Sequence, residues 1–101
     1  MKEFLRGNDI KVKWSVGSSV KEGQLYVYGG TYRYEINCTL SAGVVSGMIA
    51  GDLLPTGFYS LEYVYSYTEN EKQVYRRLKK GSCFAITEDE DDTEDNFTLA
   101  L

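Results

Sequence analysis

The sequence predicts a single all-β domain in which antiparallel strands pack face to face as a sandwich. Apolar side chains recur at every second position through much of the chain, which is the pattern of a strand with one buried face. The composition agrees, because nine Tyr, ten Gly and one Pro in 101 residues favour strands joined by tight turns. No segment has the periodicity of a long helix. A closed barrel is the competing arrangement, since closure removes the exposed edges of a sheet.

The first half of the chain contains three segments with strand periodicity. In Asp9–Val16, apolar residues alternate with two lysines and a serine, so one face is predicted to be buried. Leu25–Tyr28 is a short strand closed by Gly29-Gly30, a pair that readily adopts the positive φ angles of a hairpin turn. Thr31–Leu40 alternates again. The side chains on its apolar face are Tyr32, Tyr34, Ile36, Cys38 and Leu40.

The second half contains one turn-bounded strand and a long aromatic hairpin. Val44–Ile49 is expected to be a strand, and the connection after it contains a proline, which has no N–H to give to a sheet. Phe58–Tyr67 and Gln73–Leu78 are predicted to pair as a hairpin, with the polar segment between them as its tip. A glycine and a serine then allow a bend or bulge before the strand Cys83–Thr87. The chain is therefore expected to have about seven strands.

The charge distribution divides the chain into three parts. Residues 1–87 form the predicted β-sandwich domain, residues 88–95 an acidic loop or arm, and residues 96–101 a short C-terminal strand or tail. Seven of the eight residues from Glu88 to Asp95 are acidic; without them the chain has 8 acidic and 11 basic residues, a net charge of +3 against −4 for the whole. A run of like charges usually stays solvated. The alternative is that it docks on a basic patch of a partner or of a neighbouring subunit.

No residue pattern in the chain indicates catalysis. There is no His, so imidazole-dependent triads and the commonest zinc sites are excluded. No glycine-rich loop follows a strand and opens a helix, so the sequence has no phosphate-binding cradle. The acidic run lacks the spacing of a calcium loop, and no pair of carboxylates stands out as a glycosidase site. We therefore expect no enzyme activity, no cofactor and no metal.

The most informative side chains are aromatic and basic. Tyr is enriched at protein interfaces because it buries a large area and keeps a polar tip, although a row of Tyr can also belong to the core or bind a sugar. The basic cluster around Arg76 has two interpretations, a phosphate-binding patch or a match to the acidic run within or between subunits. Because the overall charge is negative, no nucleic acid is expected. The candidate interaction surface consists of Tyr32, Tyr34, Tyr63, Tyr65, Tyr67, Arg76 and Arg77.

Two further features concern the cellular compartment. The chain has no apolar stretch of the ~20 residues that span a bilayer and no apolar run typical of a secretory signal. Synthesis in a bacterial cytoplasm, without membrane contact, is therefore expected. Cys38 and Cys83 are expected to be free thiols, because small secreted disulfide scaffolds usually have more cysteines. A bridge between them would require Cα atoms within ~7 Å of each other.

Three segments carry a likeness to a known family. Phe4–Ile10 (Phe-Leu-Arg-Gly-Asn-Asp-Ile) leads into the first strand, Ile49–Glu62 contains Gly-Asp-Leu-Leu-Pro-Thr-Gly-Phe-Tyr-Ser-Leu-Glu, and Gly81–Thr87 follows a basic strand. Together they resemble the immunoglobulin-like β-sandwich domains of phage and prophage tail or baseplate proteins, particularly the small versions in Bacteroides-type bacteria. The N-terminal domain of the baseplate upper protein is a related type.

This resemblance implies an antiparallel immunoglobulin-like sandwich with a structural role. It implies no catalytic residues, assembly with other virion proteins or with copies of itself as a homo-oligomer, and a final location in the virion. The density of tyrosines and the acidic run do not belong to the pattern that carries the resemblance. The alternative function, from a different class, is a carbohydrate-binding module that uses a tyrosine-rich sheet face.

Overall fold

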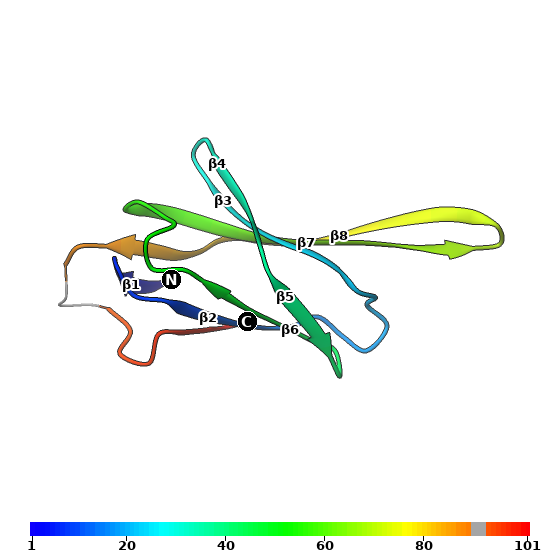
Figure 1. Cartoon of the computed structure of the whole chain (residues 1–101), viewed down its shortest axis with the longest axis horizontal. Helices are drawn as coiled ribbons and strands as arrows, with labels where there is room; N and C mark the ends of the chain where they lie inside the picture. Colours follow the sequence, from blue (N-terminus) through cyan, green and yellow to red (C-terminus); the bar gives the residue numbers. More distant parts are fainter. Residues whose placement is uncertain (90–92) are drawn as a thin grey trace.

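The chain folds into two sheets packed in a sandwich-like arrangement (Figure 1). A computed structural model describes residues 1–89 and 93–101, and in these residues it contains nine strands and no helix. The prediction of an all-β domain is therefore confirmed. The strands are β1 Lys2–Leu5, β2 Ile10–Ser15, β3 Gly23–Gly29, β4 Tyr32–Ile36, β5 Cys38–Ser41, β6 Val44–Ile49, β7 Gly57–Glu69, β8 Lys72–Thr87 and β9 Thr98–Ala100.

The first sheet has the strand order β1-β8-β7-β3-β4, and two hairpins build most of it. In the β3–β4 hairpin Gly29 pairs with Tyr32, so the turn lies at the predicted glycine pair. In the β7–β8 hairpin the last pair is Glu69 with Lys72. The two residues at that tip, Asn70 and Glu71, have φ angles of 50° and 65°. Positive φ at both central residues is what a type I′ hairpin turn requires.

A bulge divides the β7–β8 hairpin into two halves. The register shifts between Tyr59 and Leu61, and Ser82 on the opposite strand has a φ of 44°. The backbone N–H of Ser82 donates a hydrogen bond to the Ser60 hydroxyl at 2.7 Å, which satisfies a donor at the point where pairing is interrupted. The bulge lies where a bend was predicted. However, β8 continues through it, so the strands expected at Gln73–Leu78 and Cys83–Thr87 are one.

The second sheet has the order β5-β6-β2-β9. Its first strand, β5, begins at Cys38, only two residues after β4 ends in the first sheet. The single strand predicted over Thr31–Leu40 is therefore two strands, and the chain crosses between the sheets at Asn37. Alternation alone could not reveal this crossing, because the period-two pattern continues through it without a break.

The expectation of antiparallel pairing throughout is wrong for two strand pairs. β1 pairs with β8 in parallel, and β9 pairs with β2 in parallel. Both added strands come from the ends of the described chain and lie beside strands that are distant in sequence, so no tight turn fixes their direction. Alternation in a sequence predicts a strand and its buried face, but it contains no information about the direction of the neighbour.

The two sheets enclose one hydrophobic core. On the first sheet, Tyr59 stacks on Phe84 with ring centroids 5.6 Å apart, and Phe4 meets Phe84 edge-on at 6.1 Å. Trp14, on β2 of the second sheet, is buried in the same cluster. The side chains with no exposed surface are Phe4, Ile10, Val12, Leu25, Val27, Val45, Leu61, Tyr63, Phe84 and Leu99.

The β7–β8 hairpin extends well beyond this core (Figure 1). The last residue of β7 that pairs with β3 is Tyr65, opposite Gly23. Residues 66–75, which we call the arm, pair only with each other in the described part of the chain. The arm contributes to the elongated shape of the molecule, whose extents are 52 × 28 × 20 Å.

Gly23 is expected to tolerate no side chain, because β3 approaches β7 closely there. A Cβ atom at Gly23 would lie 2.0 Å from the Val64 carbonyl oxygen and 2.7 Å from the Tyr65 Cβ. Gly23→Ala should therefore lower the free energy of unfolding by about 2 kcal/mol, the usual cost of overpacking. Gly81→Ala is the matched control, since a Cβ there meets nothing within 4 Å. Urea denaturation of both variants tests this, and equal stabilities would contradict the close approach.

Candidate interaction surface

The seven residues predicted to form one interaction surface lie in three different environments. Tyr63 has no exposed surface and donates a hydrogen bond to the Lys21 carbonyl at 2.8 Å, so it is a core residue. Tyr32 and Tyr34 lie on the edge strand β4. The remaining four residues, Tyr65, Tyr67, Arg76 and Arg77, lie on the β7–β8 hairpin, at or near the base of the arm.

Of the two β4 tyrosines, Tyr32 borders a cleft at one end of the first sheet. Tyr32 and Tyr34 stack with centroids 6.0 Å apart and an interplanar angle of 21°. The cleft, of about 330 Å³, lies between the β3–β4 turn and the connection into β7. Phe58 lines it and is 67% exposed, and Tyr32 is 44% exposed. This end of the molecule therefore presents two large aromatic side chains to solvent.

The base of the arm carries a second aromatic group. Tyr65 stacks with Tyr67 at 6.2 Å, and the guanidinium of Arg76 lies 5.9 Å from the centre of the Tyr67 ring. An open groove of about 370 Å³ runs beside these residues, and it is lined by Gln24, Val64, Tyr65, Ser66, Tyr75, Arg76 and Arg77. Tyr75 is 74% exposed. Tyr and Arg are the residue types that contribute most to binding energy at protein interfaces.

Arg77 takes part in an ion-pair network on the outer face of the first sheet. Glu62 is only 7% exposed, and its carboxylate accepts hydrogen bonds from Arg33 at 3.0 Å and from Arg77. The Arg33 guanidinium also lies 3.8 Å from the centre of the Tyr26 ring. Burial by itself raises the pKa of Glu62, but the two guanidinium groups outweigh burial and hold this pKa below its ordinary value. Glu62 thus remains ionised and joins β4, β7 and β8.

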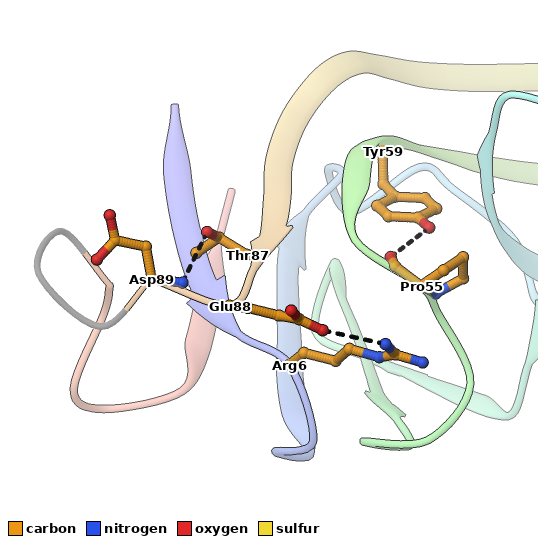
Figure 2. Close-up of polar contacts among 6 residues, drawn as sticks. All are labelled: Arg6, Pro55, Tyr59, Thr87, Glu88 and Asp89. Carbon is orange, nitrogen blue, oxygen red and sulfur yellow. Dashed lines mark hydrogen bonds and ion pairs between the residues drawn. The ribbon is translucent and has the colours of Figure 1, made fainter.

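The acidic run is held beside β1 at both ends of its described part. Figure 2 shows Arg6 paired with Glu88, at 3.2 Å, and the Asp89 backbone N–H donating to the Thr87 hydroxyl at 3.1 Å. The backbone N–H of Glu94 donates to the Glu3 carbonyl at 2.7 Å. Residues 90–92 of the acidic run lie outside the described residues. The ion pair of Glu88 is with Arg6, and that of Arg77 is with Glu62.

Sequence reasoning missed several residues that shape these surfaces. Glu62 and Arg33 are not among the predicted surface residues, and nothing in a single sequence signals that two cations converge on one carboxylate. Phe58 and Tyr75 are also absent from the predicted surface. Strand alternation places them on the faces opposite Tyr59 and Val74, so the sequence does signal that they point away from the core.

The described residues offer little for metal or nucleophilic chemistry. Among residues 1–89 and 93–101 there is no cluster of three Cys, Asp or Glu side chains that could hold a metal ion. Cys38 and Cys83 are free thiols, and burial raises the pKa of each, which disfavours the reactive thiolate. No helix in the described residues is long and apolar enough to cross a membrane.

Comparison with known proteins gives no relative. No family model matches the chain, no curated protein matches its sequence, and no solved structure matches its fold. The geometry of this molecule and the resemblance noted in its sequence are therefore what supports a function for the chain.

The Glu62 network predicts a pH dependence of stability. A carboxyl whose pKa is lower in the folded state than in the unfolded state stabilises the fold at pH values above its unfolded pKa, here about 4.5. This contribution is lost as the pH falls through the folded pKa. Glu62→Gln should cost about 1 kcal/mol at pH 7, since both arginines are half exposed, and the gap from the wild type should narrow below pH 4.5. Thermal melts across pH 3–7 measure the gap, with Glu71→Gln at the exposed tip as control. A gap independent of pH would contradict this role.

Proposed function

We propose that this chain is a non-enzymatic interaction module with an immunoglobulin-like fold, acting as a structural component of a phage or prophage tail or baseplate. It works through contacts with other virion proteins or with copies of itself. One observation carries the proposal: the arm leaves the core as a two-stranded ribbon with stacked tyrosines and arginines at its base, and no other strand covers it in the described chain.

The arrangement of strands supports the immunoglobulin-like assignment. In that fold, strands D, E and B neighbour one another in one sheet, and strands C′, C, F and G do so in the other. If β2 to β8 are taken as B, C, C′, D, E, F and G, the orders β5-β6-β2 and β4-β3-β7-β8 match both sheets. The parallel strands β1 and β9 are additions at the edges of this frame.

A hydrogen bond from Tyr59 provides independent support. Immunoglobulin-like domains often contain a tyrosine near the start of strand F whose hydroxyl bonds to the backbone a few residues upstream. Tyr59 is the third residue of β7, and its hydroxyl donates to the Pro55 carbonyl at 2.6 Å (Figure 2). Burial, with smaller effects of Tyr32 and Tyr34, raises the pKa of Tyr59, so the hydroxyl remains a donor at neutral pH.

An uncovered ribbon is a costly feature unless something binds it. An isolated two-stranded hairpin is at best marginally stable in water, and an exposed strand edge is a template for pairing with another chain. Tyr67 and Val74 continue the inward face of the hairpin beyond Tyr65, which still packs against the core, and β-sheet cover is missing there in the described residues. A second protein surface would cover these side chains.

The carbohydrate-binding alternative is less favoured by this geometry. It depended on a flat face shared by the tyrosines, but Tyr63 lies in the core and Tyr32 lies on a different hairpin from Tyr67. A sugar-binding face needs several aromatic rings beside one another. Among residues 1–89 and 93–101, only the pairs Tyr32–Tyr34 and Tyr65–Tyr67 provide stacked rings that are not fully buried, and they belong to separate surfaces.

Removing the arm should abolish partner binding without unfolding the domain. Residues 66–75 are replaced by Asn-Gly, which restores a two-residue turn between the paired residues Tyr65 and Arg76. When it is co-expressed with the proteins encoded beside its gene, the full chain should co-elute with a structural virion protein, and the shortened chain should not. Glu71→Gly is the control, because it improves the same turn and keeps the arm. A complex that survives the deletion would refute the role of the arm.

Tyr59→Phe tests the immunoglobulin-like corner. Loss of the hydroxyl leaves the Pro55 carbonyl without this donor, so the free energy of unfolding should fall by about 1 kcal/mol. Tyr75→Phe removes a hydroxyl from an exposed ring and should leave stability within about 0.5 kcal/mol of the wild type. The two variants are compared by urea denaturation. If Tyr59→Phe is as stable as the wild type, the corner contributes nothing to this fold.

A further inference from the structure

The outer edge of β8 is open along most of its length. β1 pairs only with Phe84–Thr87, so in the described chain no strand lies beside β8 from Lys72 to Cys83 on that side. This stretch carries exposed cations and no anion. We call four of them, Arg76, Arg77, Lys79 and Lys80, the cationic strip.

The opposite charge is concentrated beyond the other end of β8. Figure 1 shows the carboxyl end of β8, in orange, and the tip of the arm, in yellow-green, at opposite ends of the long axis. The described acidic residues after that carboxyl end are Glu88, Asp89, Glu94 and Asp95, which we call the acidic end. The molecule therefore has separated charges of opposite sign, joined by one extended strand.

These two regions do not reach each other within one molecule. Glu88 lies eight positions after Lys80, which is about 25 Å along a strand. That distance exceeds the ~8 Å Debye length at physiological ionic strength. The acidic end is also tied to β1 by the Arg6–Glu88 ion pair and by the hydrogen bond from Glu94 to Glu3. Since β1 occupies the end of the β8 edge, the strip and the acidic end meet only between molecules.

We propose that the acidic end of one copy docks on the cationic strip of the next, so that the chain associates head to tail with itself. This inference rests on the proposed interaction function and names its partner as a second copy. The contact is heterologous, because each copy contributes a different surface to each of its two neighbours. Such contacts build rings when they close and filaments when they do not. The groove at the base of the arm, with the exposed Tyr75, borders the strip and supplies apolar area to the interface.

Two other occupants of the strip are less compatible with the charges. Antiparallel pairing of two β8 edges about a two-fold axis would place cations of one copy opposite cations of the other, and like charges directly opposite are destabilising. A nucleic acid would use the cations on phosphates, but the net charge of −4 and the acidic end repel a polyanion. The second copy has the complementary charge and is present wherever the protein is made.

Two variants separate the halves of the contact. Arg76→Glu with Lys80→Glu brings the net charge of the four strip residues from +4 to 0 and leaves intact Arg77, which pairs with Glu62. Glu94→Lys with Asp95→Lys brings the net charge of the four residues of the acidic end from −4 to 0 and leaves intact Glu88, which pairs with Arg6. Circular dichroism and thermal melts first establish that both variants fold like the wild type. Sedimentation velocity then measures association of each variant in about 0.1 M and about 1 M salt, where the Debye length is ~10 Å and ~3 Å.

The wild type should form dimers and larger species. Its association constant should fall about tenfold when the salt concentration is raised from the lower to the higher value. Each variant alone should be a monomer. A mixture of the two should form a 1:1 dimer that grows no further, because only one functional strip and one functional acidic end remain. A chain with all four substitutions should also be a monomer, since neither its strip nor its acidic end keeps a net charge.

Several results would overturn the proposal. These are a wild type that stays monomeric at low salt, a strip variant that associates as the wild type does, or a dimer formed by either variant alone. Retention of a single-stranded oligonucleotide by the strip in place of a second copy would also overturn it. If the chain does not self-associate but binds a virion protein through the arm, this inference fails and the proposed function stands. If it self-associates through the strip but binds no virion protein, this inference stands, and of the proposed function only the contacts with copies of itself remain.

Discussion

The position of β7 in the middle of the first sheet is the constraint on which the rest of the structure depends. β7 pairs with β3 on one side and with β8 on the other, so both of its edges are occupied up to Tyr65. Its inward positions, including Leu61 and Tyr63, lie in the core with no exposed surface. Its outward positions include Glu62, which pairs with Arg77 of the neighbouring β8 and with Arg33 of β4, one strand further away. Past Tyr65 the pairing with β3 ends, while the pairing with β8 continues. The same alternation therefore runs on into a two-stranded ribbon whose inward face is not covered by another strand in the described residues.

Charge distribution determines what that ribbon and its neighbouring edge can do. An open edge of β8 invites pairing with another strand, and natural sheets often block such pairing with lysine or with other charges. Here the cations of β8 oppose pairing of two identical edges, while Glu62 binds the side chain of Arg77 on the outer face. Arg76 lies by contrast near the Tyr67 ring and donates only to the Tyr75 carbonyl among the bonds that the structure shows. Neighbouring arginines thus have different roles because they lie on opposite faces of one strand.

Much of the local structure could be predicted from the sequence, because strand alternation and turn chemistry are local properties. The Gly29-Gly30 turn, the polar tip of the long hairpin and the bulge before Cys83 all lie where the residues indicate. What is not local could not be predicted. Tyr63 and Tyr65 are the same residue type on the same face of one strand, yet only Tyr63 has no exposed surface. The difference depends on where the second sheet ends, and the alternation contains no information about that boundary.

The parallel pairing of β1 with β8 matters for the proposed function. β1 covers the β8 edge only from Phe84 to Thr87, and the acidic segment is tied to Glu3 of β1 and to Arg6, which directly follows β1. Had β8 been covered along its whole length, the cations would flank a closed edge and would have no access to a strand-like partner. Had β1 been absent, the acidic residues could fold back along the edge and neutralise the cations within the molecule. A short parallel strand at this position therefore keeps opposite charges apart on a rigid frame, and it leaves them to be matched by another molecule.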